Sequence, residues 1–529
     1  MSSSPAQRLR DPIFLLALAA GLAAFVVQSG ELGTADTTHR LQTSTSWWTS
    51  EPEVFPNEFP EFGIHGRGGQ LHSWYGMGQS LLMLPFDILG TFVQQLSIFS
   101  RYEGTDPEVR SIIVSYSTNI LVTVLTALVC FRFLRQLRFT TKESVVGVLA
   151  LLFSTSHLHY TQNMMENNYI MLLTLIGLSF QYEWLRTAST RSLLIGSAGF
   201  GLNLLTRLTT GLDLLAGGLF LILVLWLERT GGRIFRQRFI SYAKTTPVYL
   251  LFLLIDRVYQ HHRFGSFFNT YVSVYAQEYK RLHPNLPAQY PWEVPFHVGF
   301  FGALFTPEKS IFLFDPLLIL TAVVAVLAWR KFRPEVKAYV ITAIVLLFAY
   351  ISFYAKYTVW SGDFAWGDRY VSTTAELAAF ISVPLLLRYR AQLGGAVWAL
   401  GVALIAISTI IQVASLMFWL PLEIYQMYTF GHPTFVIWLR FKNIVAFALG
   451  KMAAWGLNTD DMTYDPWDYV HITTWNFLPF LLRRVGVAPR WAVNLTFAIW
   501  GAALVMLAWT LGRLRSVLRC GELEEHSGA

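Results

Sequence analysis

The chain has 529 residues, of which 54% are hydrophobic and only 14% are Asp, Glu, Lys or Arg. A soluble globular protein carries about 25% charged residues, so this chain has too little charge to cover a folded surface in water. Composition indicates an integral membrane protein and excludes soluble enzymes, secreted disulfide scaffolds and nucleic-acid binding. The net charge of +7 then reports orientation first, because Lys and Arg collect on the cytoplasmic side of a membrane protein.

The first predicted element is an apolar helix from about Ile13 to Val27, preceded by Arg8 and Arg10. A basic flank before a short apolar stretch also fits a signal peptide. We favour a retained first span, because the polar segment that follows, GELGTADTTHRLQTSTSWW, has catalytic character and requires anchoring.

Asp36 in that segment is a candidate general base. A carboxylate at a low-dielectric boundary can be tuned for proton transfer, and the neighbouring hydroxyls, His39 and Arg40 could orient it. The alternative is that Asp36 caps the helix carrying His39 and Arg40. Glu31, just before it, is interpreted as an ordinary interfacial acid.

Basic clusters recur after every second apolar run and define an orientation. The six clusters are Arg132, Arg135, Arg138 and Lys142; Arg186 and Arg191; Arg229, Arg233, Arg236 and Arg238; Arg330, Lys331, Arg333 and Lys337; Arg388 and Arg390; and Arg513, Arg515 and Arg519. They alternate with outward segments. One consistent topology has about 12 spans with both termini in the cytoplasm.

Three outer segments are long, at residues 28–110, 257–310 and 421–490. The first contains an apolar stretch from Gly76 to Phe99, in which Pro85 and Asp87 predict a broken or interfacial helix. In the third, the basic residues Arg440, Lys442 and Lys451 favour a second interfacial helix between Pro433 and Trp455 over a span. Residues 520–529 form a cytoplasmic tail, and residues 1–529 are expected to be a single membrane domain.

The remaining charges beside apolar runs lie at the outer ends of spans, where each is a functional candidate. Glu166 is either a second acid facing the same cavity or a solvated turn residue. Arg207 could bind a phosphate with two hydrogen bonds or anchor a helix at the interface. In the loop WSGDFAWGDRYV, Asp368 could simply pair with Arg369.

Two other groups carry weaker signals. His65, Arg67 and His72 lie in a glycine-rich stretch and could form a metal or phosphate site, although two histidines seven residues apart are weak support for a metal. Four acids, Asp460, Asp461, Asp465 and Asp468, are most simply a hydrated acidic loop. The sequence assigns no cofactor and leaves a divalent-metal requirement open.

Several stretches together resemble the GT-C superfamily of polyprenyl-phosphate-sugar-dependent glycosyltransferases, in particular bacterial members related to the protein mannosyltransferase and aminoarabinose-transferase group. The stretches are HSWYGMGQSLLMLPFDILG, NMMENNYIMLLTL, GFGLNLLTRLTTGL, ALFTPEKSIFLFDPLLIL and WSGDFAWGDRYV. Their order and spacing over residues 1–390 carry the likeness, while the last third is similar only in hydropathy. The resemblance implies an all-α, GT-C-like bundle of about 12 transmembrane helices in a bacterial inner membrane, with interfacial helices in large outer loops.

The resemblance also implies roles for individual residues. Asp36 matches the catalytic base of the family, and Glu166 its second acid. The substrate-binding candidates are Arg207 and Arg369, which would hold the lipid phosphate, together with Lys309, His72 and Tyr75. Two departures weaken the match, because Glu308 and Lys309 stand where many relatives have Gly-Lys, and Asp368 replaces the usual proline.

The expected activity is inverting transfer of a sugar from a polyprenyl-phosphate donor to a hydroxyl of a lipid, glycan or protein acceptor on the outer face of the membrane. A transporter of about 12 spans or a lipid flippase is the alternative. Transport predicts internal repeats and charges at the bilayer midplane. The sequence shows no repeat, and Asp213 in the sixth apolar run is the one candidate for a midplane charge.

Overall fold

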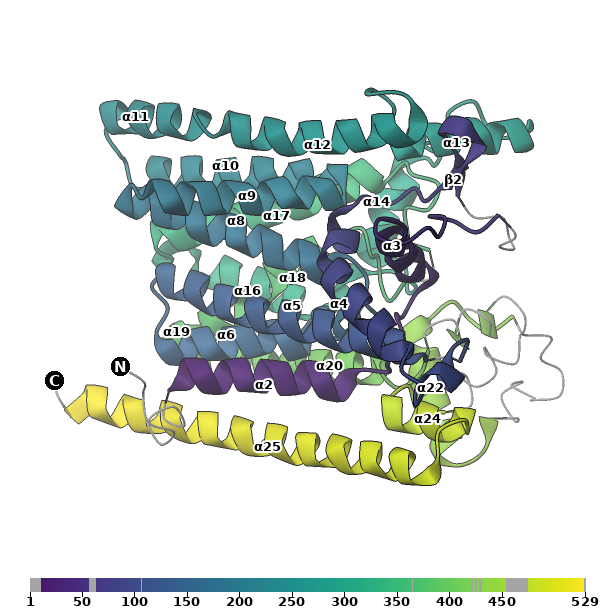
Figure 1. Ribbon diagram of the computed structural model, residues 1–529. Coiled ribbons are helices and arrows are strands. Elements are labelled where there is room, and N and C mark those ends of the chain that lie inside the picture. Colours follow the sequence, from purple (N-terminus) through teal and green to yellow (C-terminus); the bar gives the residue numbers. More distant parts are fainter. Residues whose placement is uncertain are drawn as a thin grey trace.

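A computed structural model describes residues 11–56, 63–105, 107–363, 365–419, 422–423, 426–427, 431–452 and 474–527. These parts are almost entirely helical, and their only two strands form a short antiparallel hairpin, β1 (Ile64–His65) and β2 (Leu71–His72). Most of the helices run roughly parallel or antiparallel to one another (Figure 1).

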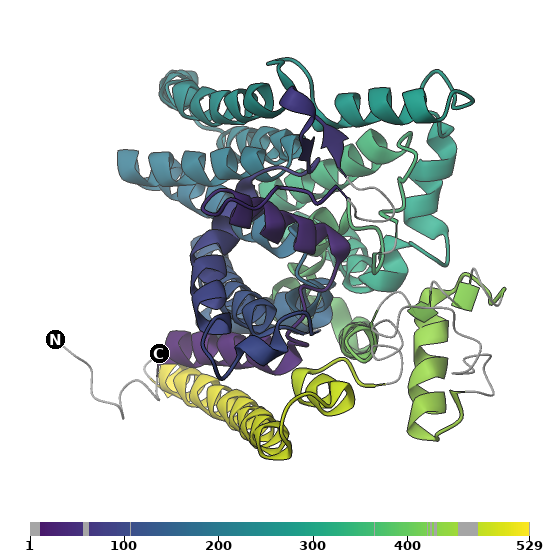
Figure 2. The ribbon, with the colours of Figure 1, turned by 45° about the vertical axis from the view of Figure 1, so that its right-hand side comes forward.

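The helices in chain order are α2 (Pro12–Val27), α3 (Ala35–Ser46), α4 (Gly78–Gln94), α5 (Val109–Gln136), α6 (Thr141–Ser154), α7 (His157–Gln162), α8 (Asn167–Thr187), α9 (Thr190–Thr206), α10 (Gly211–Leu227), α11 (Gly232–Ala243), α12 (Thr246–Phe264), α13 (Tyr271–Leu282), α14 (Phe296–Phe305), α15 (Ile311–Phe314), α16 (Leu317–Ala328), α17 (Pro334–Tyr354), α18 (Ser372–Ala379), α19 (Ser382–Arg388), α20 (Arg390–Ser415), α22 (Val436–Ala448), α24 (Leu478–Val485) and α25 (Arg490–Ser527). α11 and α12 lie along one side of the bundle and α25 along the opposite side (Figures 1 and 2).

Six helical segments among the described residues are long and apolar enough to cross a membrane. They are Val109–Gln136, Leu208–Leu227, Gly232–Phe264, Pro334–Tyr354, Arg390–Ser415 and Arg490–Cys520. Two further apolar helices, α2 and α14, are shorter. The predicted, predominantly helical fold is therefore confirmed, and the six apolar helices agree with a membrane protein. Length and composition alone do not establish the expected number of about 12 spans. The predicted first span, α2, is buried on much of its surface and packs against α5 and α25.

The basic clusters gather at one end of the bundle. The Arg388 guanidinium donates to the carbonyl oxygen of Arg138 at 2.6 Å and to Glu143 Oε2 at 2.6 Å. The Nε atom of Arg138 in turn lies 3.6 Å from Glu335 Oε1. The start of α2 and the C-terminal part of α25 lie at this same end (Figure 1). Contacts between clusters far apart in sequence agree with the prediction that they share one side of the membrane.

The opposite end carries the elaborated polar segments, with α3, the hairpin, α13, α14, α22 and α24 gathered there (Figures 1 and 2). α4 does not have the predicted break, since it continues through Pro85. Asp87 is fully buried and accepts hydrogen bonds from Trp48 Nε1 at 3.0 Å and Arg110 Nε at 2.8 Å. A buried carboxylate needs such partners, and these bonds dock α4 onto α3 and α5.

α22 lies within the predicted second interfacial helix, but Arg440, one of the three basic residues on which that prediction rests, is not exposed to solvent. Arg440 is fully buried and pairs with Glu423 at 2.6 Å. It donates to the carbonyl oxygens of Ser415, the last residue of α20, and of Phe418 just after that helix. A cation at a helix C-terminus satisfies carbonyl groups that the helix itself leaves without partners. The proposed acidic loop at Asp460, Asp461, Asp465 and Asp468 lies outside the described residues. α25 continues into the predicted tail as far as Ser527.

Candidate functional site

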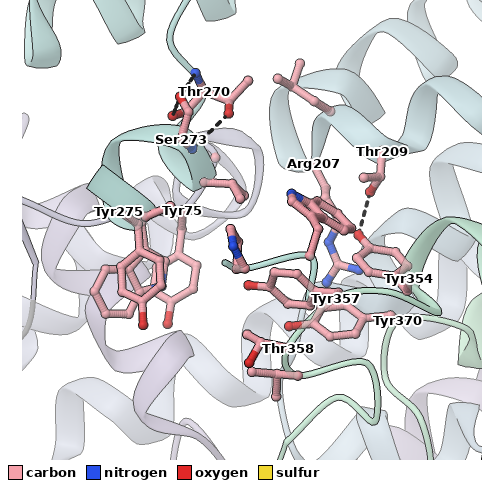
Figure 3. Close-up of a pocket in the computed structure, with 18 of the residues that line it drawn as sticks. Tyr75, Arg207, Thr209, Thr270, Ser273, Tyr275, Tyr354, Tyr357, Thr358 and Tyr370 are labelled. Atoms are coloured by element: carbon pink, nitrogen blue, oxygen red, sulfur yellow. Dashed lines mark hydrogen bonds between the residues drawn. The ribbon is translucent and has the colours of Figure 1, made fainter. Parts of the chain in front are cut away.

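A cavity of about 710 Å³ opens at the end of the bundle opposite the basic clusters. Its walls come from α3, the segment after β2, the residue before α8, the end of α9 and the turn that follows it, and α13. Residues 290–292 and the end of α17 with the loop that follows it complete the walls. Figure 3 shows part of this lining, with Tyr75 and Tyr275 on one side in the view and Arg207, Tyr354 and Tyr370 on the other. Segments from most of the chain therefore meet at one site.

Asp36 lies in the first turn of α3 and faces this cavity. The Arg369 guanidinium donates to Asp36 Oδ2 at 2.5 Å. The capping alternative is wrong, because Thr34 is the N-cap and accepts from the Thr37 amide at 3.2 Å. The alternative pairing of Asp368 with Arg369 is also wrong, because Asp368 accepts instead from the Tyr370 amide at 3.0 Å. Arg369 and Asp36, 333 residues apart, are the pair that the fold brings together.

Glu166 lies between two arginines in the same cavity. One carboxylate oxygen pairs with Arg40 at 2.7 Å and the other with Arg207, and all three side chains are buried. Burial overturns the solvated-turn reading of Glu166 and the interfacial-anchor reading of Arg207. The sequence predicted for Arg40 only a role in orienting Asp36, although its spacing of four from Asp36 predicts that both side chains face the same side of a helix.

Aromatic rings surround the charged groups. The Arg40 guanidinium lies 4.1 Å above the ring of Tyr75, and the Tyr75 hydroxyl hydrogen-bonds with Asp36. Across the cavity, Tyr370 has Arg207 5.2 Å and Arg369 5.3 Å from its ring centre. Cations over aromatic faces are attracted by the ring quadrupole, so these rings hold the guanidiniums without neutralising them.

Tyr75 reaches its position because two glycines follow it closely. A Cβ at Gly76 or Gly78 would collide with Thr206 at the end of α9, so the chain can approach α9 only without side chains there. Arg207 is the next residue after that helix end. The glycines therefore hold Tyr75 and Arg207 around one cavity.

Asp36 and Glu166, two of the carboxylates that line the cavity, are ionised at neutral pH. Burial raises the pKa of Asp36, but the Arg369 and Arg40 guanidiniums outweigh burial and hold the pKa below its usual value. Burial likewise raises the pKa of Glu166, and Arg40 and Arg207 together hold it far below its usual range. The whole lining contains four cationic side chains, which are Arg40, Arg207, Lys280 and Arg369, and three carboxylates, which are Asp36, Glu166 and Asp363. One positive charge is therefore in excess, which suits an anionic ligand.

Lys309 does not line the cavity, so its position does not support the predicted contact with substrate. Its buried ammonium donates to the carbonyl oxygens of Asp363 at 2.6 Å, Ala365 at 2.9 Å and Gly367 at 3.2 Å. Three carbonyl acceptors use all three donors of an ammonium group. Lys309 thus fixes the loop that precedes Arg369 and positions that arginine.

His72 lies behind the cavity lining. Its Nδ1 is 2.8 Å from Glu53 Oε2, and Glu53 Oε1 accepts from Arg263 at 2.8 Å. His65 instead pairs with Glu278 of α13. The two histidines therefore face different acids, and among the described residues no group of three or more His, Cys, Asp or Glu side chains is arranged to hold a metal. The predicted substrate contact of His72 is not supported by this position.

The contacts of Glu53 with Arg263 and His72 predict that the stability of the fold depends on pH. Burial raises the pKa of Glu53, but Arg263 and His72 outweigh burial and lower it to about 2. A lowered carboxyl pKa contributes stability above the unfolded-state pKa of about 4.3, and this contribution is lost as the pH falls toward 2. We expect Glu53→Gln to lower the unfolding free energy by about 3 kcal/mol at pH 7 and by much less near pH 2, measured by denaturation in detergent micelles. Glu51→Gln, an exposed neighbour, is the control, and a difference that stayed constant down to pH 2 would contradict the assignment.

Comparison with protein-family models, with curated proteins and with solved structures finds no match to this chain. A proposal about function therefore rests on the cavity and on the resemblance seen in the sequence. The observation with most weight is the cavity, where Asp36, Glu166, Arg207 and Arg369 gather although they are widely separated in the chain.

Proposed function

We propose that this protein is a membrane glycosyltransferase of the GT-C type that moves a sugar from a polyprenyl-phosphate donor to an acceptor hydroxyl. The observation that carries the proposal is the cavity in which a carboxylate, Asp36, lies among the guanidiniums of Arg369, Arg40 and Arg207. Such a site offers a base for the acceptor and cations for the phosphate of the leaving lipid. Apolar helix surfaces around it suit the prenyl chain.

In this reaction the acceptor oxygen forms a bond to the anomeric carbon as the bond from that carbon to the lipid phosphate oxygen breaks. Asp36 takes the acceptor proton, and the lipid phosphate leaves with the bonding electron pair. A single displacement inverts the anomeric configuration. Arg207 and Arg369 stabilise the phosphate as its charge grows.

Arg369 links the two halves of the reaction. Its guanidinium pairs with Asp36 at 2.5 Å, which keeps the pKa of Asp36 low and the carboxylate a weak base. A donor phosphate attracts the same guanidinium. Donor binding therefore weakens the hold of Arg369 on Asp36 and raises the pKa of Asp36 toward the range in which a carboxylate accepts a proton more readily.

The proposal includes a bundle of about 12 spans, with the basic end in the cytoplasm of a bacterial cell and the cavity on the outer side. Besides the six long apolar helices, α2, α6, α8, α9, α16 and the pair α18 and α19 would complete the count. Lys and Arg at one end favour this orientation under the positive-inside rule. Accessibility labelling of single cysteines placed at residues 36 and 513 from the two sides of the membrane tests it, and labelling of both positions from the same side would refute it.

Arg207→Ala is expected to raise the KM for the polyprenyl-phosphate sugar by about 10-fold to 100-fold, since a charge-assisted contact to a phosphate is worth about 1.5–3 kcal/mol. The KM for the acceptor should change little. Arg186→Ala, at the basic end, is a matched control that removes an arginine far from the cavity. An unchanged donor KM in Arg207→Ala would exclude a phosphate contact.

The direct test incubates the purified protein with a panel of radiolabelled polyprenyl-phosphate sugars and asks which label leaves the lipid. Transport is the competing function, and Asp213 on α10 is the buried charge that favours it. Asp213, however, accepts from Thr174 Oγ1 at 2.9 Å and from the Tyr350 hydroxyl, which ties it to neighbouring helices. Label that crosses a vesicle membrane without leaving its lipid would favour a flippase over the transferase.

A further inference from the structure

Tyrosine and tryptophan rings form one wall of the cavity. The ring of Trp74 lies 5.3 Å from that of Tyr275, which stacks on Tyr279 at 5.4 Å, and Tyr279 stacks on Tyr290 at 5.5 Å. Trp74, Tyr275 and Tyr290 line the cavity, and Tyr279 supports them from outside it. These four residues are called the α13 aromatic wall below.

The wall is held in place before any ligand binds. The Tyr290 hydroxyl donates to the Tyr275 hydroxyl at 3.2 Å, and a capping box between Thr270 and Ser273 fixes the first turn of α13. Backbone bonds from Val294 to Lys356 and from Thr358 to Pro291 tie the segment after α13 to the opposite wall. A preorganised surface pays little ordering entropy on binding, so the wall suits recognition.

The stereochemistry of the proposed reaction decides which substrate meets this wall. Inversion places the attacking oxygen and the departing phosphate on opposite faces of the anomeric carbon. Arg207 and Tyr370 lie on one side of the cavity, while Tyr275 lies on the other with Tyr75, which hydrogen-bonds with the base Asp36 (Figure 3). The phosphate belongs beside Arg207, and the acceptor therefore belongs beside Tyr75 and Tyr275.

The chemistry of the wall then selects the acceptor. An aromatic face is electron-rich and apolar, and it attracts the weakly positive C–H groups that cover one face of a pyranose ring. The side chains of Thr270 and Gln277 lie along the same wall and suit the sugar hydroxyls at the ring edge. Glu278, the acid of α13, is turned toward His65 instead. A flat polyhydroxylated ring fits this combination of groups.

We propose that Tyr275, supported by Trp74 and Tyr290, is the platform on which a pyranose ring of the acceptor stacks, so that the acceptor is a glycan. This inference rests on the proposed transferase activity. It assigns specificity to α13, which supplies neither the proposed base nor the arginines proposed to bind the phosphate.

Binding and transfer test it separately. In saturation-transfer NMR with the full-length protein in micelles, we expect methyl glucopyranoside and methyl mannopyranoside to bind the wild type and Tyr275→Phe, and to lose binding to Tyr275→Ala. In transfer assays, Tyr275→Ala should raise the KM for a pyranoside acceptor about 10-fold, with the donor KM unchanged. Phe268→Ala is the control, because that ring is 92% exposed just before α13 and lies outside the cavity lining.

The outcomes separate the two proposals. If pyranosides bind equally to wild type and Tyr275→Ala, or if a threonine-containing peptide is glycosylated and pyranosides are not, the acceptor assignment is overturned while the transferase stands. If Tyr275→Ala raises the donor KM instead, the wall binds the sugar of the donor. If binding depends on Tyr275 but no sugar leaves any donor lipid, the platform is supported and the transferase proposal fails.

Discussion

Replacing Asp36 with asparagine is expected to lower the kcat of sugar transfer by about 10²–10⁴-fold, the range associated with the loss of a positioned general base. Asparagine keeps the size of the side chain and can still accept from Arg369, so the cavity should keep its shape. The amide cannot take a proton from the acceptor hydroxyl. Radiolabelled donor turnover by the purified variant, at saturating donor and acceptor, measures the effect.

Two controls sharpen this test. Glu51→Gln removes an exposed acid of the same outer segment and should leave turnover unchanged. Asp36→Asn should also reach the membrane fraction at the wild-type level and bind donor normally. Near-normal turnover by Asp36→Asn would exclude Asp36 as the base, because a neutral side-chain amide is far too weak a base to replace a carboxylate.

The pH dependence of the wild type adds an independent check. Because Arg369 and Arg40 hold the pKa of Asp36 below its usual value, the carboxylate stays ionised as the pH falls from 7 to 5. Transfer at low donor concentration should therefore show no loss from Asp36 over that interval. Arg369→Gln removes the first of these cations and should move the acid limb of the profile to higher pH.

Spacing and charge placement made part of this site predictable. The six basic clusters could be assigned to one side of the membrane from the sequence, because the positive-inside rule depends only on where Lys and Arg lie relative to the apolar segments. Asp36, Glu166, Arg207 and Arg369 stood out because charge beside apolar segments is expensive and rarely accidental. That reasoning identifies each residue separately and does not predict which residues lie together. The structure shows that all four line one cavity.

The partners of those residues could not be read from the sequence. Asp36 pairs with a residue 333 positions away, and the nearby Asp368 turned out not to pair with Arg369. Two predicted substrate contacts are not supported by the positions of the side chains, and they share a cause. Lys309 and His72 are polar residues in glycine-rich or loop segments, and sequence does not distinguish a side chain that binds substrate from one that satisfies buried carbonyls or a buried acid.

The composition of single helices was also an incomplete guide to the environment of their side chains. Arg440 suggested an interfacial helix because an arginine is usually solvated, yet its guanidinium pairs with Glu423 and donates to carbonyl groups at the C-terminal end of α20. The α13 aromatic wall was missed because tyrosines spaced by four residues look like ordinary amphipathic helix packing. Only the cavity on one side of those rings distinguishes a binding surface from a packed one.

The second large effect is expected for Glu166→Gln, which should lower the unfolding free energy by about 3–5 kcal/mol. The carboxylate lies between Arg40 and Arg207, and its removal leaves two buried guanidiniums without their counter-ion. Thermal or denaturant unfolding in micelles measures the change. Glu166→Asp, which keeps the charge on a shorter side chain, should lose less.

A double-mutant cycle with Arg207→Gln separates positioning from direct contact with substrate. If Glu166 acts by holding the arginines, Glu166→Gln combined with Arg207→Gln should cost less than the sum of the single changes, with a coupling energy of about 0.5–3 kcal/mol. Strictly additive losses would show that the pair does not act as a unit. If Glu166 also orients the acceptor, the KM of Glu166→Gln for the acceptor should rise even under conditions in which the variant stays fully folded. The loss of one carboxylate oxygen that accepts a hydrogen bond would then act on acceptor binding directly, not through stability.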